Sequence, residues 1–295
     1  MKLTQTELDQ LHKIQPLLFF YASQLNHLVK GFDELDDFFE LSYQNKITIR
    51  DAIYQDRAWI FEKFAKAYQE HFTDDDIEVI LSWKNQIKDS FFVVKQLKKY
   101  AKFLSEKEEK AYGVEALHET FDELLHLPSW AETVLLPFKG KITYDGLILY
   151  KNVSFGASIR KSINHQLSMA EAKYGLITSL PYEEEEEDNE KLLAFYAKSE
   201  ENRYYYADEI KEIIFKSESL KELYYREVAK SNAKKLSKSL RLAGLKSGYF
   251  AIIDEVIVAS GATKKEVEKN IKAIVPKDRV GYVYIYQLKR RRGER

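Results

Sequence analysis

Residues 134–150, VLLPFKGKITYDGLILY, carry the clearest β-strand pattern in this chain of 295 residues. The apolar run at 134–138 predicts one strand, and residues 141–150 predict a hairpin with Asp145 and Gly146 at its centre. An Asp-Gly pair accommodates the two positive φ angles of a type I′ turn, which matches the twist of a hairpin. The stretch therefore predicts a small mixed or antiparallel sheet in the middle of the chain.

Helices are expected upstream of this sheet, over residues 4–88. Thr4 and Glu7 have the spacing of a capping box, in which both side chains satisfy backbone groups at a helix start. Thr48 and Thr73 predict two further helix starts. Apolar residues recur at spacings of three and four, which is typical of a helix with one buried face: Leu8, Leu11, Ile14, Leu18, Tyr21 and Leu25.

Shorter elements are expected on either side of the sheet. Residues 91–94 and 103–104 indicate two short strands, with a helix through residues 98–100 as the alternative, and residues 115–125 predict a short helix. A longer helix is expected at 157–174. This order of elements predicts a first domain, residues 1–182, that is helical at its start and contains the sheet.

An acidic run at 183–190 separates two regions of different charge. Seven of its eight residues are Asp or Glu, and because they repel one another and bury nothing, we expect a solvated linker. Residues 1–182 carry 22 Lys and Arg against 26 Asp and Glu, whereas residues 191–295 carry 24 against 14. The net charge of -1 therefore conceals a basic C-terminal part.

Beyond the linker, two helices and a ββαβ module are predicted. The helices are expected at 189–216 and 219–243 and form a basic helical arm, residues 191–247. The module and its basic tail cover residues 248–295 and are small for an independent core. We expect the module to pack against the preceding helix or against a second copy of itself in a homodimer. All these elements together predict an α+β protein.

The composition excludes several classes of protein. The chain contains no cysteine, which excludes disulfides, thiolate zinc sites and a cysteine nucleophile, and fits a reducing cytoplasm. The first residues, MKLTQTE, lack the apolar core of a signal peptide. The longest apolar stretches fall far short of the ~20 residues that span a bilayer. We therefore expect a cytoplasmic protein that does not contact a membrane.

Two Glu-x-x-His pairs have the spacing of metal ligands. Glu115 with His118, and Glu123 with His126, match a pair used in di-iron carboxylate proteins, whose ligands come from four helices. If both pairs lie on one helix with its rise of about 1.5 Å per residue, the two histidines are about 12 Å apart. A zinc ion lies only about 2 Å from each ligand and cannot use both pairs. We predict no metal site and no cofactor.

One interpretation places a small-ligand site or a hydrolase-type active site around residues 138–165. Ser158 follows Gly156 as in a nucleophile elbow, but Arg160 stands where the elbow needs its second glycine. A second interpretation of the same residues is a site at the start of the helix expected at 157–174 that binds a phosphate or carboxylate. Four residues would converge in such a site: Asp145, Ser158, Arg160 and His165. No catalytic motif is complete, so a non-enzymatic function is favoured.

The strongest functional pattern is a basic helix. Residues 228–247 contain six Lys or Arg and no Asp or Glu. Four of them follow at spacings of four, four and three and line one flank: Lys230, Lys234, Lys238 and Arg241. Like charges four residues apart cost a few tenths of a kcal/mol, and a bound polyanion reverses this cost. We therefore predict an intracellular binding or regulatory protein whose partner is nucleic acid or an acidic protein, with a merely solvated helix face as the alternative.

Two segments resemble known families. LLPFKGKITYDGL (135–147), the turn at 154–156 and YGLITSLP (174–181) lie in a region, residues 110–181, that resembles a family of uncharacterised cytoplasmic proteins of Gram-positive-type bacteria. Some members of that family end in a cysteine-rich metal-binding tail, which this chain lacks. Residues 248–288 are similar to a small ββαβ domain of unassigned function. The resemblances imply the domain division and a cytoplasmic location, and neither implies a reaction.

Overall fold

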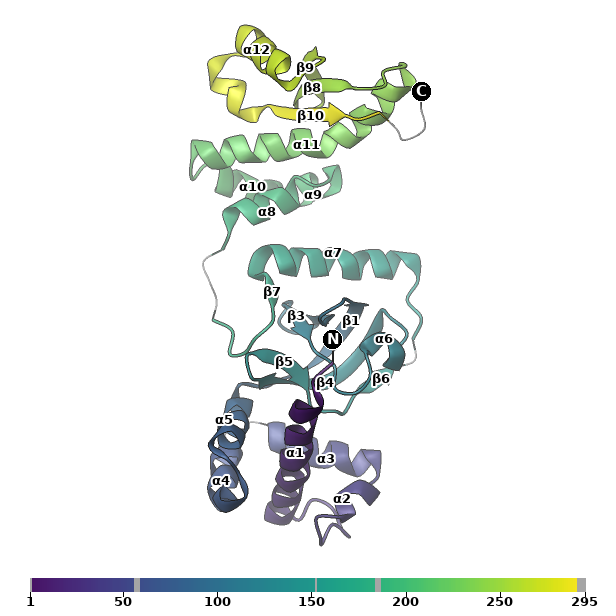
Figure 1. Cartoon of the computed structure of the whole chain (residues 1–295), viewed down its shortest axis with the longest axis vertical. Coiled ribbons are helices and arrows are strands. Elements are labelled where there is room, and N and C mark those ends of the chain that lie inside the picture. Colours follow the sequence, from purple (N-terminus) through teal and green to yellow (C-terminus); the bar gives the residue numbers. More distant parts are fainter. Residues whose placement is uncertain (1, 56–58, 152, 184–186, 291–295) are drawn as a thin grey trace. The chain divides into compact units, whose positions relative to one another are not determined.

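The computed structural model describes residues 2–55, 59–151, 153–183 and 187–290 of the chain (Figure 1). The chain divides into two compact units, Met1–Glu185 (unit 1) and Glu186–Arg295 (unit 2). Helices and sheets are mixed, so the fold belongs to the predicted α+β class. The predicted linker includes residues 184–186, which lie outside the described part of the chain.

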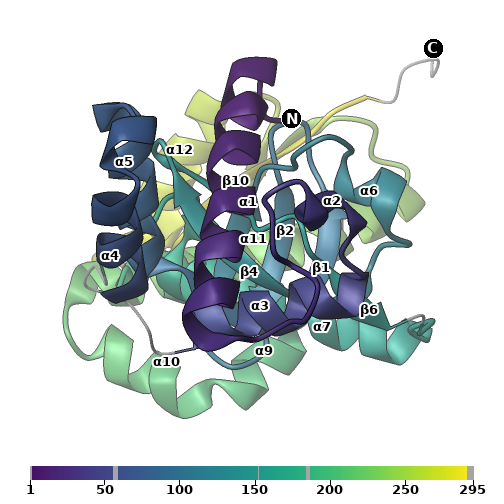
Figure 2. The same cartoon turned by 90° about the horizontal axis from the view of Figure 1, so that it is seen from below.

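Unit 1 begins with a helical layer. Its helices are α1 (Gln5–Asn26), α2 (Asp37–Glu40), α3 (Tyr43–Tyr54), α4 (Trp59–Ala67), η1 (Gln69–His71), α5 (Asp74–Ser82) and η2 (Trp83–Asn85). α1 packs against α3, α4 and α5 (Figure 2). Thr4 and Thr73 take part in capping boxes at the starts of α1 and α5, which confirms both predicted helix starts. The prediction at Thr48 is wrong, because Ser42 caps α3 and Thr48 lies inside that helix.

A seven-stranded sheet follows the helical layer. Its strands are β1 (Ile87–Gln96), β2 (Ala101–Ser105), β3 (Ala111–Val114), β4 (Ser129–Phe138), β5 (Lys141–Tyr144), β6 (Leu149–Lys151) and β7 (Leu176–Ile177). The order is β1-β2-β3-β5-β4-β6, and β7 pairs with β3. An additional pairing of β1 with β4 closes the sheet into a small barrel. β3 runs parallel to β5 and β7, and the other strand pairs are antiparallel, so the sheet is mixed.

The predicted hairpin turn at Asp145-Gly146 is wrong. The chain reverses earlier, between β4 and β5, where Lys139 and Gly140 have positive φ angles of 49° and 73°. Two consecutive positive φ angles are the signature of a type I′ turn. At the expected position Gly146 has a positive φ of 81°, whereas Asp145 is not among the positive-φ residues.

Asp145 instead begins a bulge between two collinear strands. β5 and β6 both pair with β4, and residues 145–148 lie opposite Thr133 and Val134, so four residues face two. The backbone N–H of Asp145 donates to the Val134 carbonyl at 3.0 Å. The Asp145 carboxylate accepts from the N–H of Leu147 at 3.1 Å. These bonds keep the chain running along β4 instead of reversing it.

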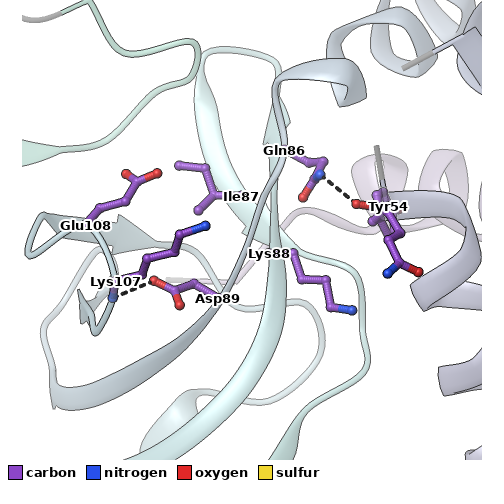
Figure 3. A pocket seen from close by; sticks show the side chains of 8 residues that line it. Tyr54, Gln86, Ile87, Lys88, Asp89, Lys107 and Glu108 are labelled. Atoms are coloured by element: carbon purple, nitrogen blue, oxygen red, sulfur yellow. Dashed lines mark hydrogen bonds between the residues drawn. The ribbon is translucent and has the colours of Figure 1, made fainter. Parts of the chain in front are cut away.

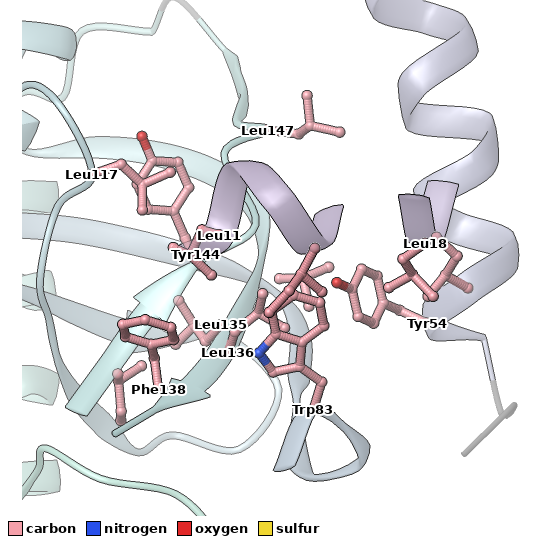
Figure 4. Packing of buried hydrophobic residues seen from close by; sticks show 14 of the residues in the cluster. Leu11, Leu18, Tyr54, Trp83, Leu117, Leu135, Leu136, Phe138, Tyr144 and Leu147 are labelled. Atoms are coloured by element: carbon pink, nitrogen blue, oxygen red, sulfur yellow. The ribbon is translucent and has the colours of Figure 1, made fainter. Parts of the chain in front are cut away.

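The sheet of unit 1 is covered on two sides (Figure 1). α7 (Ala157–Tyr174) covers β1, β2 and β3 through Ile163, Leu167 and Ala170, which pack with Val94 and Leu104. On the other side, the sheet and the helical layer share one large core (Figure 4), which includes Leu11, Leu18, Trp83, Leu135, Leu136, Phe138 and Tyr144. This core isolates the residues of α7 from those of α3.

The helix predicted at 115–125 is wrong over most of its length. Helix α6 contains Phe121–Leu124 alone, with a capping box at Thr120. The N–H of Glu115 donates to the Ile142 carbonyl at 2.8 Å, so the backbone at Glu115 extends the pairing of β3 with β5. The two Glu-x-x-His pairs therefore do not share a helix, contrary to the premise from which the sequence excluded a metal.

Unit 2 contains the helical arm and the ββαβ module. Its elements are α8 (Asn189–Tyr196), α9 (Glu200–Tyr205), α10 (Ala207–Ile214), α11 (Glu218–Leu242), β8 (Gly248–Ile253), β9 (Val256–Gly261), α12 (Lys264–Ile274), η3 (Lys277–Tyr282) and β10 (Tyr284–Leu288). The single helix predicted at 189–216 is wrong, because three short helices occupy it. Asp188 caps the start of α8, and Ser199 caps the start of α9, where the helical conformation resumes.

The ββαβ module packs against the preceding helix, as predicted. Its sheet has the order β10-β8-β9. Val267 and Ile271 of α12 pack with Ala251 on one face, and Ala229 and Ala233 of α11 pack with Ile252 on the other. Successive residues of β8 thus point to opposite faces of the sheet and pack against different helices. Among the residues described in the two units, no helix has the length and apolar character needed to cross a membrane.

Candidate functional site

The basic helix of the sequence analysis is α11, and its packing decides which of its side chains face solvent. Ala229 and Ala233 lie against the sheet and are buried. Asn232 is also buried, and its amide donates to the Asp254 carbonyl at 3.1 Å. The Ser231 hydroxyl donates to the Lys198 carbonyl at 2.8 Å, on the side of α8 and α9. The remaining flank of α11 faces solvent and carries the lysines.

Two of the four predicted basic residues present unpaired charges. Lys234 and Lys238 are exposed, and within the described chain neither has an acidic partner. Lys230 is exposed but donates to Glu227 at 2.9 Å, one turn earlier. Its charge is therefore partly neutralised, and it contributes less to the field of this flank.

Arg241 is placed differently from the prediction. It is half-buried, and its Nη2 donates to the carbonyl of Lys289 at 2.7 Å. This bond joins the last turn of α11 to the end of β10, 48 positions away in sequence. Lys289 and Arg290 are exposed at that junction. We call Lys234, Lys238, Arg241, Lys289 and Arg290 the α11 patch.

Charge is separated along α11. The acidic residues Glu218, Glu222 and Glu227 lie in its first half, and residues 228–253 contain no Asp or Glu. The C-terminal end of a helix carries a partial negative charge, which favours the cations gathered there. The second half of α11 thus gathers positive charge without an acidic residue of its own.

The sequence prediction left out one exposed cation of α11 that lies outside the patch. Arg226 is exposed and precedes Lys230 by four residues, so it extends the same spacing toward the start of α11. That signal was present in the sequence. The basic tail that begins at Lys289 was also visible in the sequence, but only the packing of β10 brings Lys289 next to α11.

The alternative site at 138–165 does not come together as one cluster. Ser158 and Arg160 are exposed at the start of α7, and Arg160 Nε donates to the Phe155 carbonyl at 2.9 Å. His165 is half-buried farther along α7. The Asp145 side chain is fully buried and faces Arg50 of α3 instead. The four side chains therefore do not share one surface.

Asp145 and Arg50 form a buried charged pair that the sequence analysis did not identify. Arg50 Nε lies 3.9 Å from an Asp145 carboxylate oxygen, and both side chains are fully buried. Arg50 also donates to Glu132 and to Asp51, at 2.9 Å in each case. The Thr133 hydroxyl lies 3.3 Å from the second Asp145 oxygen. Asp51, Glu132 and Asp145 thus all direct a carboxylate at one guanidinium.

A signal for Arg50 did exist in the sequence. It lies three residues from Ile47 and three from Ile53, on the buried face of α3. An arginine at such a position needs acidic partners in the interior. What the sequence lacked was the identity of those partners, which come from strands about 80 to 95 positions later.

Burial sets the ionisation of this pair. Desolvation raises the pKa of Asp145 to about 7, although the nearby Arg50 guanidinium and the hydrogen bonds from Leu147 and Thr133 favour the carboxylate. The pKa of Arg50 is also raised, because the acids around it outweigh its burial. A raised pKa often marks a catalytic acid. Here the side chain has no exposed surface, so the shift indicates a structural pair.

Unit 1 also contains a polar pocket of about 340 Å³ (Figure 3). Its lining residues are Tyr54, Gln55, Gln86, Ile87, Lys88, Asp89, Lys107 and Glu108. Asp89 accepts from the N–H of Lys107 at 3.1 Å, Glu108 accepts from the Tyr112 hydroxyl at 2.7 Å, and Lys88 pairs with Asp51 at 2.8 Å. These contacts hold strands and turns in place. Neither this pocket nor a second one on α4 and α5 includes the predicted site residues.

Comparison of the chain with protein-family models, with curated proteins and with solved structures finds no match. The α11 patch is a cluster of mostly exposed cations, whereas the Asp145 side chain lies on no surface.

Proposed function

We propose that this chain is a binding protein that engages a polyanion, and specifically nucleic acid, through the α11 patch. The observation that carries the proposal is the contact of Arg241 with the Lys289 carbonyl. It joins the basic flank of α11 to the basic end of β10 and so concentrates five cations, of which Lys234 and Lys238 have no acidic partner in the described chain.

The physical support for a polyanion is electrostatic. Gathering like charges on one flank is unfavourable in the free protein by a few tenths of a kcal/mol per pair. Phosphates placed opposite the same charges turn repulsion into attraction and release condensed counterions. Phosphate contacts of this kind carry no sequence information. The proposal therefore implies binding with little sequence preference.

The test is fluorescence anisotropy with labelled single- and double-stranded oligonucleotides over ~50 to ~200 mM salt. The variant Lys234→Gln/Lys238→Gln/Lys289→Gln removes three exposed cations of the patch. Each lost phosphate contact removes about 0.9 from the slope of log affinity against log salt, so the slope should flatten by almost ~3 units. Circular dichroism should show an unchanged melting temperature, because the three side chains are exposed.

A matched control removes the same charge elsewhere in unit 2. Lys265, Lys269 and Lys272 are exposed on α12, and changing them to glutamine leaves the patch intact. The control should keep most of the salt slope. Equal losses in both variants would mean that net charge alone drives binding, and no binding at ~50 mM salt would remove the nucleic-acid proposal. Binding of an acidic protein but not of oligonucleotides would identify the other predicted partner.

A further inference from the structure

Two histidines from distant parts of unit 1 meet at its surface. His12 lies on α1, and His118 lies in the loop between β3 and α6. Both side chains are exposed. Their Nε2 atoms are 3.1 Å apart, their ring centroids are 5.0 Å apart, and the ring planes differ by 23°.

This geometry matches two ligands that point at one metal ion. Two imidazole nitrogens, each ~2.0–2.1 Å from a tetrahedral zinc, lie ~3.3 Å apart, close to the 3.1 Å between the two Nε2 atoms. A straight N–H···N hydrogen bond with the same nitrogen spacing puts the centroids ~5.4 Å apart, because each ring then points directly at the other. The observed 5.0 Å is shorter, so the two rings do not point straight at each other, and both Nε2 atoms can face one ion.

The backbone around both histidines is held firmly. The N–H of Leu3 donates to the Ala116 carbonyl at 3.0 Å, which pins the start of α1 to the loop that carries His118. The neighbours Leu11 and Leu117 are buried in the common core. Each histidine thus projects outward beside an anchored residue, and the approach of the two rings does not depend on mobile backbone.

We propose that His12 and His118 form a binding site for a divalent transition-metal ion, zinc or nickel in particular. Imidazole nitrogen is a preferred ligand of these ions. In the described residues no group of three or more His, Cys, Asp or Glu surrounds the pair, so solvent completes the coordination. The bound ion links α1 to the loop after β3 and stabilises unit 1. The site is independent of the α11 patch and of the function proposed for it.

The test uses the full chain without an affinity tag, titrated calorimetrically with ZnCl2 and separately with NiCl2. One ion per chain should bind, and His12→Gln or His118→Gln should each weaken binding at least tenfold. His126→Gln is the matched control, because His126 is exposed in the same region but has no partner histidine in the described structure. The control should bind like the wild type.

A second measurement reports the effect of the ion on the stability of unit 1. Because a ligand that binds only the folded state stabilises it, zinc should raise the melting temperature of the wild type and of His126→Gln. It should not raise that of His12→Gln or His118→Gln. Wild-type affinity retained in both of these variants, or no saturable binding by the wild type, would show that the two rings share only a hydrogen bond.

Discussion

Replacing Arg50 by methionine should destabilise unit 1 strongly. The Arg50 side chain is fully buried and donates to Glu132 and Asp51, with Asp145 facing its Nε at 3.9 Å. Methionine fills much of the same volume, so the loss of charge, rather than a cavity, should dominate. Removing one partner of a buried pair leaves the other uncompensated and typically costs about 3–5 kcal/mol. That is a large part of the ~5–15 kcal/mol by which domains are stable.

A second variant, Asp145→Asn, isolates the contribution of Asp145 to the pH dependence of stability. Burial raises the pKa of Asp145 from its ordinary value near 3.8 to about 7 in the folded state. The protonated form is thus favoured by folding, and the stability that it provides is present below pH ~4 and is lost as the pH rises through ~7. Asparagine does not titrate. The free energy of unfolding of Asp145→Asn relative to wild type should therefore increase between pH 4 and 8, by an amount on the order of 4 kcal/mol at most.

Arg50→Met should change this pH dependence in a defined direction. The guanidinium favours the Asp145 carboxylate, so its removal raises the pKa of Asp145 further. The loss of stability with rising pH should then continue above pH 7. In the double variant Arg50→Met/Asp145→Asn, part of the stability lost at pH 7 should be recovered, because asparagine is neutral without taking up a proton on folding.

The assay is urea unfolding followed by tryptophan fluorescence. All three tryptophans, Trp59, Trp83 and Trp130, belong to unit 1, so the signal reports that unit alone. Arg160→Met is the control, because Arg160 is exposed in the same unit and should change stability by less than about 1 kcal/mol. A cost below ~1 kcal/mol for Arg50→Met at pH 7, or a flat difference between Asp145→Asn and wild type, would refute the reasoning.

Three further outcomes follow from the structure. Gly140→Val should cost more than ~1 kcal/mol in urea unfolding, because φ is 73° at this turn position and a β-branched residue resists positive φ. Asp76→Asn should lower the free energy of unfolding by ~1–2 kcal/mol at pH 7, because Asp76 caps α5 with Thr73. Hydrogen bonds hold the pKa of Asp76 at about 2, so the stability that its carboxylate provides should be lost as the pH falls from ~4 toward ~2. Ala233→Leu should destabilise unit 2 by ~1–3 kcal/mol by overpacking the face between α11 and Ile252, visible in circular dichroism but not in tryptophan fluorescence.

Local features of the sequence predicted the elements that depend on near neighbours. Thr4 and Thr73 start helices through bonds to residues three positions away, and both capping boxes are present. The order of the ββαβ module followed from its strand and helix patterns, and its small size predicted that it packs on α11 or on a second copy of itself. Such features are visible in a sequence because the interacting groups are separated by only a few residues.

The tertiary structure decided everything that depends on partners distant in sequence. Asp145-Gly146 has the composition of a hairpin turn, but β4 offers a continuing edge and Arg50 draws the carboxylate inward, so the chain bulges there. His12 and His118 are 106 positions apart and meet through the pairing of Leu3 with Ala116. Strand edges and buried charges select their partners by burial and hydrogen bonding across the whole unit, which local composition does not encode.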